Sequence, residues 1–177
     1  PWLVGCIAAL YNPKWIGKLV PVLQGAQSFM KSAWISRLAS VVERSLYVGD
    51  IDPTRVDGYR AAVEAWIVEM AELESTTKRE AGALKSFITS ETDTFRIPYA
   101  KNPMRKKRQT SFIGTVNGTD FLKDPTGNAR FAVIEMSQAA NMDALNRLLG
   151  WKWDGTGPEL EDPEALRQFW LEVVWMY

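Results

Sequence analysis

The stretch that decides the fold of this chain reads Leu19-Val-Pro-Val-Leu-Gln24-Gly25-Ala-Gln-Ser-Phe-Met30-Lys31-Ser32. Its first six residues are almost all apolar, as in a buried strand of a parallel sheet, and a helix is predicted from Lys31 to Val42. The loop between them follows the pattern G-x-x-x-x-G-K-[ST], except that Met30 replaces the second glycine. A strand, a short loop and a helix amino terminus in this order predict a phosphate-binding turn.

This turn predicts a nucleotide site, because backbone N–H groups and the helix dipole attract anions. Lys31 would neutralise phosphate oxygens and Ser32 would be a ligand for Mg²⁺. We expect Met30 to keep a negative φ and to point away from the phosphates, since only glycine adopts a positive φ freely. The alternative is an ordinary strand-to-helix turn with a solvated lysine. The predicted phosphate-binding residues are Gly25, Ala26, Gln27, Ser28, Phe29, Met30, Lys31 and Ser32.

Short apolar runs alternate with helical stretches along the rest of the chain. Strands are predicted over residues 65–70, 111–116 and 130–134, helices over 80–89, 141–149 and 163–175, and loops over 50–58, 101–105 and 153–158. This alternation predicts an α/β P-loop NTPase domain with a mainly parallel central sheet flanked by helices. We expect the core to span residues 19–150, between a helical lead-in over 1–18 and a helical segment over 151–177, in a piece cut from a longer protein.

Composition excludes several kinds of site. The 177 residues include 21 basic and 21 acidic side chains, one cysteine and no histidine. The chain therefore has no Ser-His-Asp triad, no histidine-ligated zinc and no internal disulfide, and Cys6 is expected to be a buried core residue. Catalysis would rest on carboxylates, lysine, arginine and hydroxyl groups. No apolar run is long enough to span a bilayer, and the start does not resemble a signal peptide, so we expect a cytoplasmic protein without a membrane partner.

Polar residues stand next to the predicted strands, at positions suited to nucleotide chemistry. Glu69 and Glu72 lie where an acidic side chain holds Mg²⁺ or activates water, and which of them binds the metal is left open. Asn117 can orient water or the γ-phosphate, and Arg130 can reach the nucleotide of a neighbouring subunit. The alternatives are a solvated helix start for the glutamates, a turn for Asn117 and a surface ion pair for Arg130.

Five runs carry a resemblance to a known family: Trp66-Ile-Val-Glu-Met-Ala-Glu-Leu73, Ala83-Leu-Lys-Ser-Phe-Ile-Thr89, Asp93-Thr-Phe-Arg-Ile-Pro-Tyr99, Phe112-Ile-Gly-Thr-Val-Asn117 and Phe121-Leu-Lys-Asp-Pro-Thr-Gly-Asn-Ala-Arg-Phe131. They resemble the virulence-associated protein E-like (VapE-like) family and, more distantly, the AAA+-type superfamily 3 helicase domains of phage and plasmid primase-helicases. The resemblance puts Lys31 and Ser32 on Walker A, Glu69 and Glu72 on Walker B, and Asn117 on sensor 1. Arg130 matches the second arginine of the family's Gly-Asn-Arg-Arg-Phe-Trp signature, in which Ala129 and Ala132 replace the first arginine and the tryptophan.

This resemblance implies an ATP-dependent DNA helicase or primase-associated ATPase of phage or mobile-element replication in a bacterial host. It further implies ATP and Mg²⁺ as cofactors, and a homo-oligomeric, hexameric ring that holds single-stranded DNA in its channel. The alternative is a degenerate P-loop domain that binds nucleic acid or assembles with partners without hydrolysing ATP, as Met30 and Ala129 indicate.

One segment is strongly basic although the chain is neutral. Between Asp93 and Asp120 there are six basic residues and no acidic one, which leaves 15 basic against 21 acidic residues elsewhere. A basic loop that also carries aromatic residues suits contact with a single strand through phosphates and stacked bases. In superfamily 3 helicases the corresponding segment is a hairpin that projects into the ring channel, and the resemblance implies the same position here. The predicted nucleic-acid-binding residues are Arg96, Lys101, Arg105, Lys106, Lys107 and Arg108.

Some roles in and around this segment stay open. The alternative for the six cations is a solvated charge run, and Arg96 and Lys85 could instead contact nucleotide or a neighbouring subunit. The eight tryptophans, among them Trp151, Trp153, Trp170 and Trp175, are expected to pack in the core.

Overall fold

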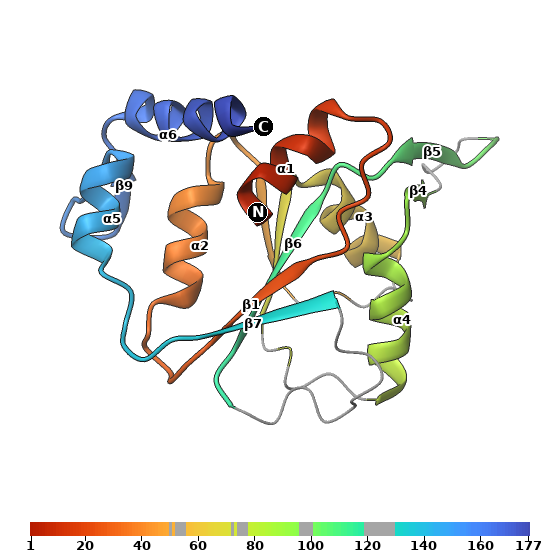
Figure 1. The fold of residues 1–177 in the computed structure, drawn as a ribbon, viewed down its shortest axis with the longest axis horizontal. Helices are drawn as coiled ribbons and strands as arrows, with labels where there is room; N and C mark the ends of the chain where they lie inside the picture. The colour runs from red at the N-terminus through yellow and green to blue at the C-terminus, as the bar shows by residue number, and fades with distance from the viewer. Residues whose placement is uncertain (50, 52–55, 72, 74–77, 96–100, 119–129) are drawn as a thin grey trace.

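The structure, a computed structural model, describes residues 1–49, 51, 56–71, 73, 78–95, 101–118 and 130–177. A wholly parallel sheet of five strands runs through the molecule, in the order β2-β3-β6-β1-β7, with helices on both faces (Figure 1). The predicted α/β class with a parallel sheet flanked by helices is thereby confirmed. The described elements are, in chain order, α1 (Trp2–Tyr11), β1 (Val20–Gln24), α2 (Lys31–Ala39), β2 (Leu46–Gly49), α3 (Val56–Glu64), β3 (Ile67–Met70), α4 (Lys78–Ile88), β4 (Thr92–Phe95), β5 (Met104–Lys107), β6 (Ser111–Val116), β7 (Phe131–Glu135), α5 (Met142–Leu149), β8 (Trp151–Trp153), β9 (Pro158–Leu160) and α6 (Pro163–Met176).

Strand β1 holds the sheet together, because it pairs with β6 on one side and β7 on the other. Its four residues Val20–Leu23 are buried, as the apolar run predicts. Pro21 has no N–H for a ladder hydrogen bond, and the pairing with β6 accordingly starts one residue later, at Val22 opposite Gly114. The strand therefore keeps full pairing at its carboxyl end, where the loop 25–30 leaves the sheet.

Two hydrophobic cores lie on opposite faces of the sheet, because side chains alternate along each strand. On β6, Phe112 belongs to the core beneath α3 and α4, whereas Ile113 belongs to the core beneath α1, α2, α5 and α6. Cys6 of α1 lies in the second core with no exposed surface, as predicted. Burial raises the pKa of its thiol to about 12.

The carboxyl-terminal residues add a small two-stranded sheet, β8–β9, and helix α6 to the second core. Trp170 of α6 packs against Trp66, with ring centroids 4.5 Å apart, and its Nε1 donates to the carbonyl of Leu38 at 2.9 Å. The expectation that all the tryptophans pack in the core is wrong for Trp15, Trp153 and Trp175, which are 40%, 64% and 87% exposed.

Three predicted boundaries are wrong, because tertiary contacts outweigh local signals. The predicted loop 50–58 contains the start of α3, a helix that the turn-forming residues hid and that buries Ala62 and Val63 against the sheet. Helix α2 ends at Ala39 rather than Val42, since the Ser45 hydroxyl donates to the Ala39 carbonyl at 2.6 Å. Strand β5 begins at Met104, inside the predicted loop 101–105. Strands β2, β4, β8 and β9 were not predicted, and β8 and β9 lie in the segment 151–177 that was expected to be helical.

Candidate functional site

Three parallel strands end at the same edge of the sheet, and the predicted nucleotide residues follow them. Gln24 at the end of β1 is in register with Val116 at the end of β6, and Met70 at the end of β3 is in register with Gly114. The loop after β1 starts with a hydrogen bond from Gly25 N to the carbonyl of Val116 at 3.2 Å. Ligand sites of open parallel sheets lie at such carboxyl edges.

Lys31 is the first residue of α2, and its side chain is 93% buried beneath the loop (7% exposed). Its Nζ donates to the carbonyls of Gly25 at 2.7 Å and Ala26 at 2.9 Å, and to Oδ1 of Asn117 at 3.0 Å. The structure therefore brings Lys31 and Asn117 together although 86 residues separate them. An ammonium group within reach of both the loop and a polar amide is suited to the phosphate groups of a nucleotide.

Ser32 and Glu69 form the second half of the site. The Ser32 hydroxyl donates to Oε1 of Glu69, and Thr115 Oγ1 donates to the same oxygen at 3.2 Å. Glu69 is fully buried, and within the described residues its Oε2 has no hydrogen-bond partner. Burial raises the pKa of Glu69, while the hydrogen bonds from Ser32 and Thr115 oppose the rise.

Thr115 is a site residue that the sequence prediction missed. It lies on β6 two residues before Asn117, and alternate residues of a strand point to the same face. That spacing, a polar residue inside an apolar strand and in step with Asn117, was the signal that could have found it. The resulting group of hydroxyl, carboxylate and amide oxygens is of the kind that Mg²⁺ prefers.

The loop is shaped by two residues in the left-handed region. Met30 has φ 60° and ψ 27°, so the expectation of a negative φ is wrong, and Ser28 has φ 69°. Met30 thus adopts the conformation that the glycine of the motif would supply, while its side chain is 49% exposed. These two left-handed residues flank Phe29, whose N–H donates to the carbonyl of Ala26 at 3.3 Å.

Arg130 lies at the opposite edge of the sheet. It precedes Phe131, which pairs with Val20 at the amino end of β1, so the five residues of β1 separate its backbone from the loop. At about 3.3 Å per residue this is roughly 16 Å. Arg130 therefore does not join Lys31 and Glu69 within one chain. Glu72 and Arg96, two further predicted site residues, lie outside the described residues, as does Ala129.

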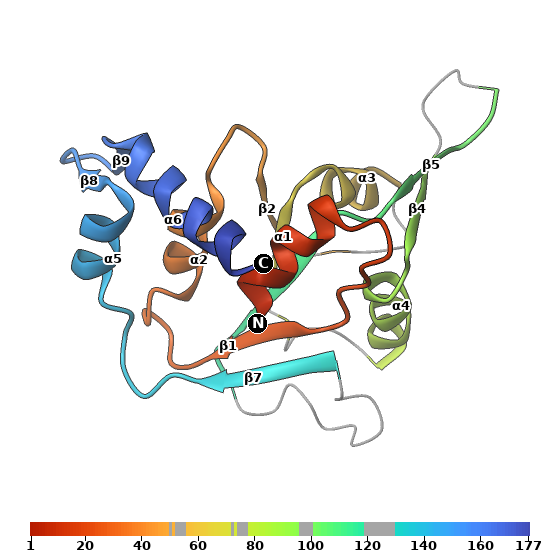
Figure 2. The same ribbon diagram turned by 45° about the horizontal axis from the view of Figure 1, so that its top comes forward.

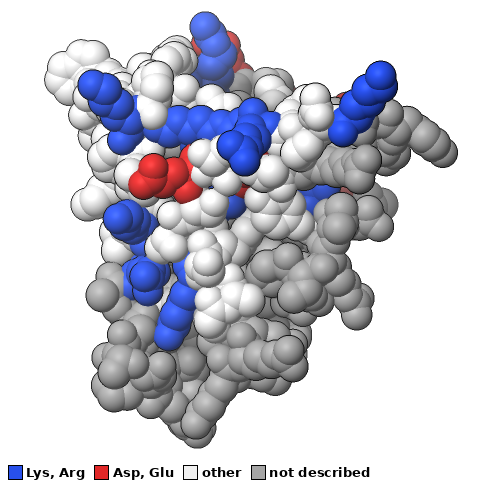
Figure 3. Space-filling model, turned by 90° about the vertical axis from the view of Figure 1, so that its right-hand side faces the viewer, with Lys and Arg blue, Asp and Glu red and all other residues white. Residues whose placement is uncertain are grey.

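The basic segment forms the strand pair β4–β5, which projects from the side of the molecule (Figure 2). Lys101 and Arg105 are exposed there, and lysine and arginine outnumber acidic side chains on this face (Figure 3). Lys106 and Lys107 are half-buried, because their Nζ atoms donate to the carbonyls of Val63 at 2.5 Å and Asn12 at 3.3 Å. Of the predicted nucleic-acid-binding residues, these four are on the surface.

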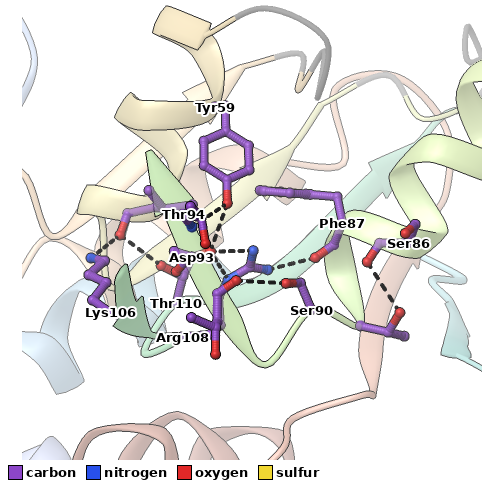
Figure 4. A network of polar contacts seen from close by, with 12 residues as sticks. Tyr59, Ser86, Phe87, Ser90, Asp93, Thr94, Lys106, Arg108 and Thr110 are labelled. Carbon is purple, nitrogen blue, oxygen red and sulfur yellow. Dashed lines mark hydrogen bonds and ion pairs between the residues drawn. The ribbon is translucent and has the colours of Figure 1, made fainter. Parts of the chain in front are cut away.

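Arg108 is not. It is 92% buried (8% exposed), and its Nε donates to Oδ1 of the fully buried Asp93 at 2.7 Å (Figure 4). Its Nη1 donates to the carbonyl of Phe87 at 2.8 Å, and its guanidinium lies over the rings of Phe87 and Phe112 at 4.4 and 5.3 Å. The prediction that Arg108 binds nucleic acid is therefore wrong. Pairing with Asp93, whose charge would otherwise be buried alone, draws the guanidinium into the interior.

Neither a cluster of metal ligands nor a membrane-spanning helix is found among the described residues. No group of three or more cysteine, aspartate or glutamate side chains could hold a metal ion among them. None of the described helices has the length and apolar character needed to cross a membrane.

Comparisons with known proteins identify a family and a fold. The family model of the virulence-associated protein E-like domain matches residues 1–153. The fold is similar to the apo structure of the NrS-1 C terminal region (305–718), with a TM-score of 0.57 and 19% sequence identity over 97% of this chain and 39% of that one. The A form of the same region gives a TM-score of 0.55, also at 19% identity, over 97% of this chain and 38% of that one. The chain thus spans about two fifths of the length of these structures, and no curated protein matched it.

Proposed function

Because the chain belongs to the virulence-associated protein E-like family, we propose that it is an Mg²⁺-dependent ATPase module. In this proposal it drives a helicase or primase-associated motor on DNA during phage or mobile-element replication, in the cytoplasm of a bacterial host. The observation that carries the proposal is the meeting of four groups at the carboxyl edge of the sheet, Lys31 with Asn117 and Ser32 with Glu69.

The loop and Lys31 would bind the phosphates of ATP. The position of this loop between β1 and the amino end of α2 supports this, since helix amino termini attract anions. Lys31 Nζ would exchange the carbonyls of Gly25 and Ala26 for phosphate oxygens, and Asn117, already 3.0 Å from this atom, would orient the γ-phosphate or water.

The residues present also fit Mg²⁺. Ser32 supplies a hydroxyl oxygen, and the orphaned Oε2 of Glu69 supplies a carboxylate oxygen that has no other partner among the described residues. When bound, the ion would neutralise charge on the phosphates. A cation there would also remove the cost of keeping Glu69 ionised while buried.

Arg130 would act on the ATP of a neighbouring subunit. Its position at the amino edge of the sheet supports this role. In a ring that sets the amino edge of one subunit against the phosphate loop of the next, Arg130 would face the neighbour's nucleotide. A ring of six subunits with DNA in its channel is the assembly we propose, with β4 and β5 directed at the DNA.

Lysine variants test the nucleotide site directly. Lys31→Ala should reduce ATP hydrolysis at least 100-fold, on the order expected when a main transition-state donor is lost. Lys152→Ala is the matched control, since Lys152 is exposed and pairs with Glu161 far from the loop. Thermal unfolding of both variants checks that each is folded. Undiminished turnover by a folded Lys31→Ala variant would refute the assignment.

A second candidate is a degenerate P-loop domain that binds nucleic acid without hydrolysing ATP. The left-handed Met30 favours it, because a side chain there carries a conformational cost that a working loop would avoid with glycine. Calorimetric titration with a non-hydrolysable ATP analogue and Mg²⁺ separates the two candidates. Absence of binding at millimolar nucleotide would favour the degenerate domain.

A further inference from the structure

Two hollows adjoin where the connection between α1 and β1 passes the base of β4 and β5. One is an apolar cavity of about 300 Å³, and the other is a groove of about 280 Å³ lined mainly by cations. Ile16 and Glu91 line both, so the two lie side by side, and we treat them together as one depression. Neither belongs to the nucleotide site, which lies at the carboxyl edge, whereas the cavity reaches Ser111 and Phe112 at the start of β6.

The walls of this depression are tied together by hydrogen bonds. Lys107 Nζ donates to the carbonyl of Asn12, and Gln109 Nε2 donates to the carbonyl of Leu10, both at 3.3 Å. These bonds join the end of α1 to the chain that leaves β5, although 95 and 99 residues separate the partners. The depression is therefore a feature of the folded chain and does not need a ligand to assemble it.

The groove is suited to a polyanion. Four cationic side chains and one carboxylate, Glu91, line it. The ammonium groups of Lys106 and Lys107 bond to backbone carbonyls, which satisfy their hydrogen bonds but leave their charges in place. Lys14 and Arg105 are exposed and form no ion pair with any other described residue. Phosphate groups are the anions that such a row of cations attracts.

The cavity is suited to a flat aromatic group. Its apolar lining includes Trp2, Trp15, Ile16, Leu19 and Phe112, and its polar lining includes Lys18, Glu91 and the side chain of Arg108, which is paired with Asp93. Trp15 remains 40% exposed, and a Cβ on Gly17 would come within 3.3 Å of the indole Nε1, so the ring packs closely against its own chain. Within the described residues the indole N–H donates no hydrogen bond. A fixed, partly exposed indole beside cations is a platform on which a base can stack.

We propose that this depression binds single-stranded nucleic acid, with phosphates along the groove and one base in the cavity against Trp15. The proposal deepens the proposed function, on which its choice of polymer rests. It adds the connection at residues 12–19 as a second wall of the nucleic-acid path, opposite β5. An acidic peptide would use the cations but not the indole, and an apolar protein segment would use the cavity but not the cations. Only a nucleotide chain uses both.

Tryptophan variants separate base stacking from phosphate contact. Fluorescence anisotropy, without ATP, measures binding of an oligo-thymidine strand and of an abasic strand of equal length. Trp15→Ala should weaken oligo-thymidine binding roughly tenfold, the scale of one lost stacking contact, and leave abasic binding unchanged. Trp15→Phe, which keeps an aromatic ring, should restore most of the affinity. Trp153→Ala, an exposed tryptophan on β8, is the matched control and should bind both strands like the parent.

A lysine variant tests the groove. Lys14→Ser should weaken both strands alike and reduce the slope of log K against log salt by about one, as expected for one lost phosphate contact. Lys152→Ser should change neither quantity.

Two results would overturn the proposal. One is an unchanged affinity of Trp15→Ala and Lys14→Ser for both strands. The other is a variant of Trp15 that alters the subunit mass in light scattering but not the affinity for DNA, which would make the depression a protein contact. Because no ATP is present, loss of turnover in Lys31→Ala cannot produce either result, and the failure of the proposed ATPase leaves this test intact.

Discussion

Neutralising Asp93 should destabilise the chain severely, because it would leave the guanidinium of Arg108 buried and unpaired. Asp93 is fully buried and Arg108 is 8% exposed, with Oδ1 of the aspartate 2.5 Å from Nη2 and 2.7 Å from Nε. Removing one partner of such a buried pair costs about 3–5 kcal/mol. We therefore expect Asp93→Asn to lose an amount of this order in the free energy of unfolding. The loss should be insensitive to salt, since buried charges are poorly screened.

A double variant tests whether the cost comes from the unpaired charge. Replacing both partners, as in Asp93→Leu with Arg108→Met, removes the two charges together and leaves apolar groups among Phe87 and Phe112. Replacement of a buried pair by apolar residues is often close to neutral. The double variant should therefore be more stable than Asp93→Asn, although the hydrogen bond from Nη1 to the Phe87 carbonyl is lost. The coupling in the cycle of variants should be about 2 kcal/mol or more.

Urea unfolding followed by circular dichroism at low and high salt measures these free energies. Tyr59→Phe is a graded control, since its hydroxyl donates to Asp93 at a long 3.3 Å and its loss should cost only about 0.5–1 kcal/mol. A loss below about 1 kcal/mol for Asp93→Asn would refute the buried pair. So would a double variant whose loss equals the sum of its single variants.

Experiments on three further residues, Gly150, Met30 and Cys6, have definite expected outcomes. Gly150→Ala should cost at least about 2 kcal/mol in urea unfolding, because Gly150 has φ 75° and an added Cβ would lie 2.2 Å from the Asp162 carbonyl oxygen; an unaltered midpoint would contradict this. Met30→Gly should raise the free energy of unfolding by about 1 kcal/mol by relieving its left-handed conformation, and a loss of stability would instead show that the side chain packs usefully. Cys6 should resist Ellman's reagent in the folded chain at pH 8, and labelling as fast as in urea would contradict its burial. The pKa of Cys6 in the folded chain, about 12, lies above its value in the unfolded chain, so the unfolded thiol ionises first as the pH rises. The free energy of unfolding of the parent should therefore fall by up to about 1.4 kcal/mol per pH unit between about pH 8.5 and 12. Cys6→Ala should not show this fall.

The local pattern predicted the strands β1, β3, β6 and β7 of the parallel sheet and the meeting of polar residues at its carboxyl edge. Strand β6 has the predicted bounds, and Lys31, Ser32, Glu69 and Asn117 do converge. Parallel strands bring their carboxyl ends to one edge, so a motif after one strand and polar residues after two others must lie near each other once the sheet forms. What each converging residue contributes to turnover stays a prediction.

Other features depended on contacts between distant segments. The basic run from Arg105 to Arg108 is uniform in sequence, yet three of its cations are on the surface and Arg108 is inside. Arg108 is buried because it pairs with Asp93, a residue of β4. In the same way, no local signal links Trp15 to the strand pair β4–β5, which the fold sets beside it.

The sequence by itself determined the α/β class, the strand-to-helix loop that carries Lys31 and Ser32, and the exclusion of histidine and disulfide chemistry, because these follow from residue types and short spacings. Only the tertiary structure decided which charges are buried, that Met30 takes the glycine conformation, and that Arg130 lies at the far edge from Lys31. The physical reason is that burial and backbone strain depend on partners many residues away, whose positions are set when the whole sheet is assembled.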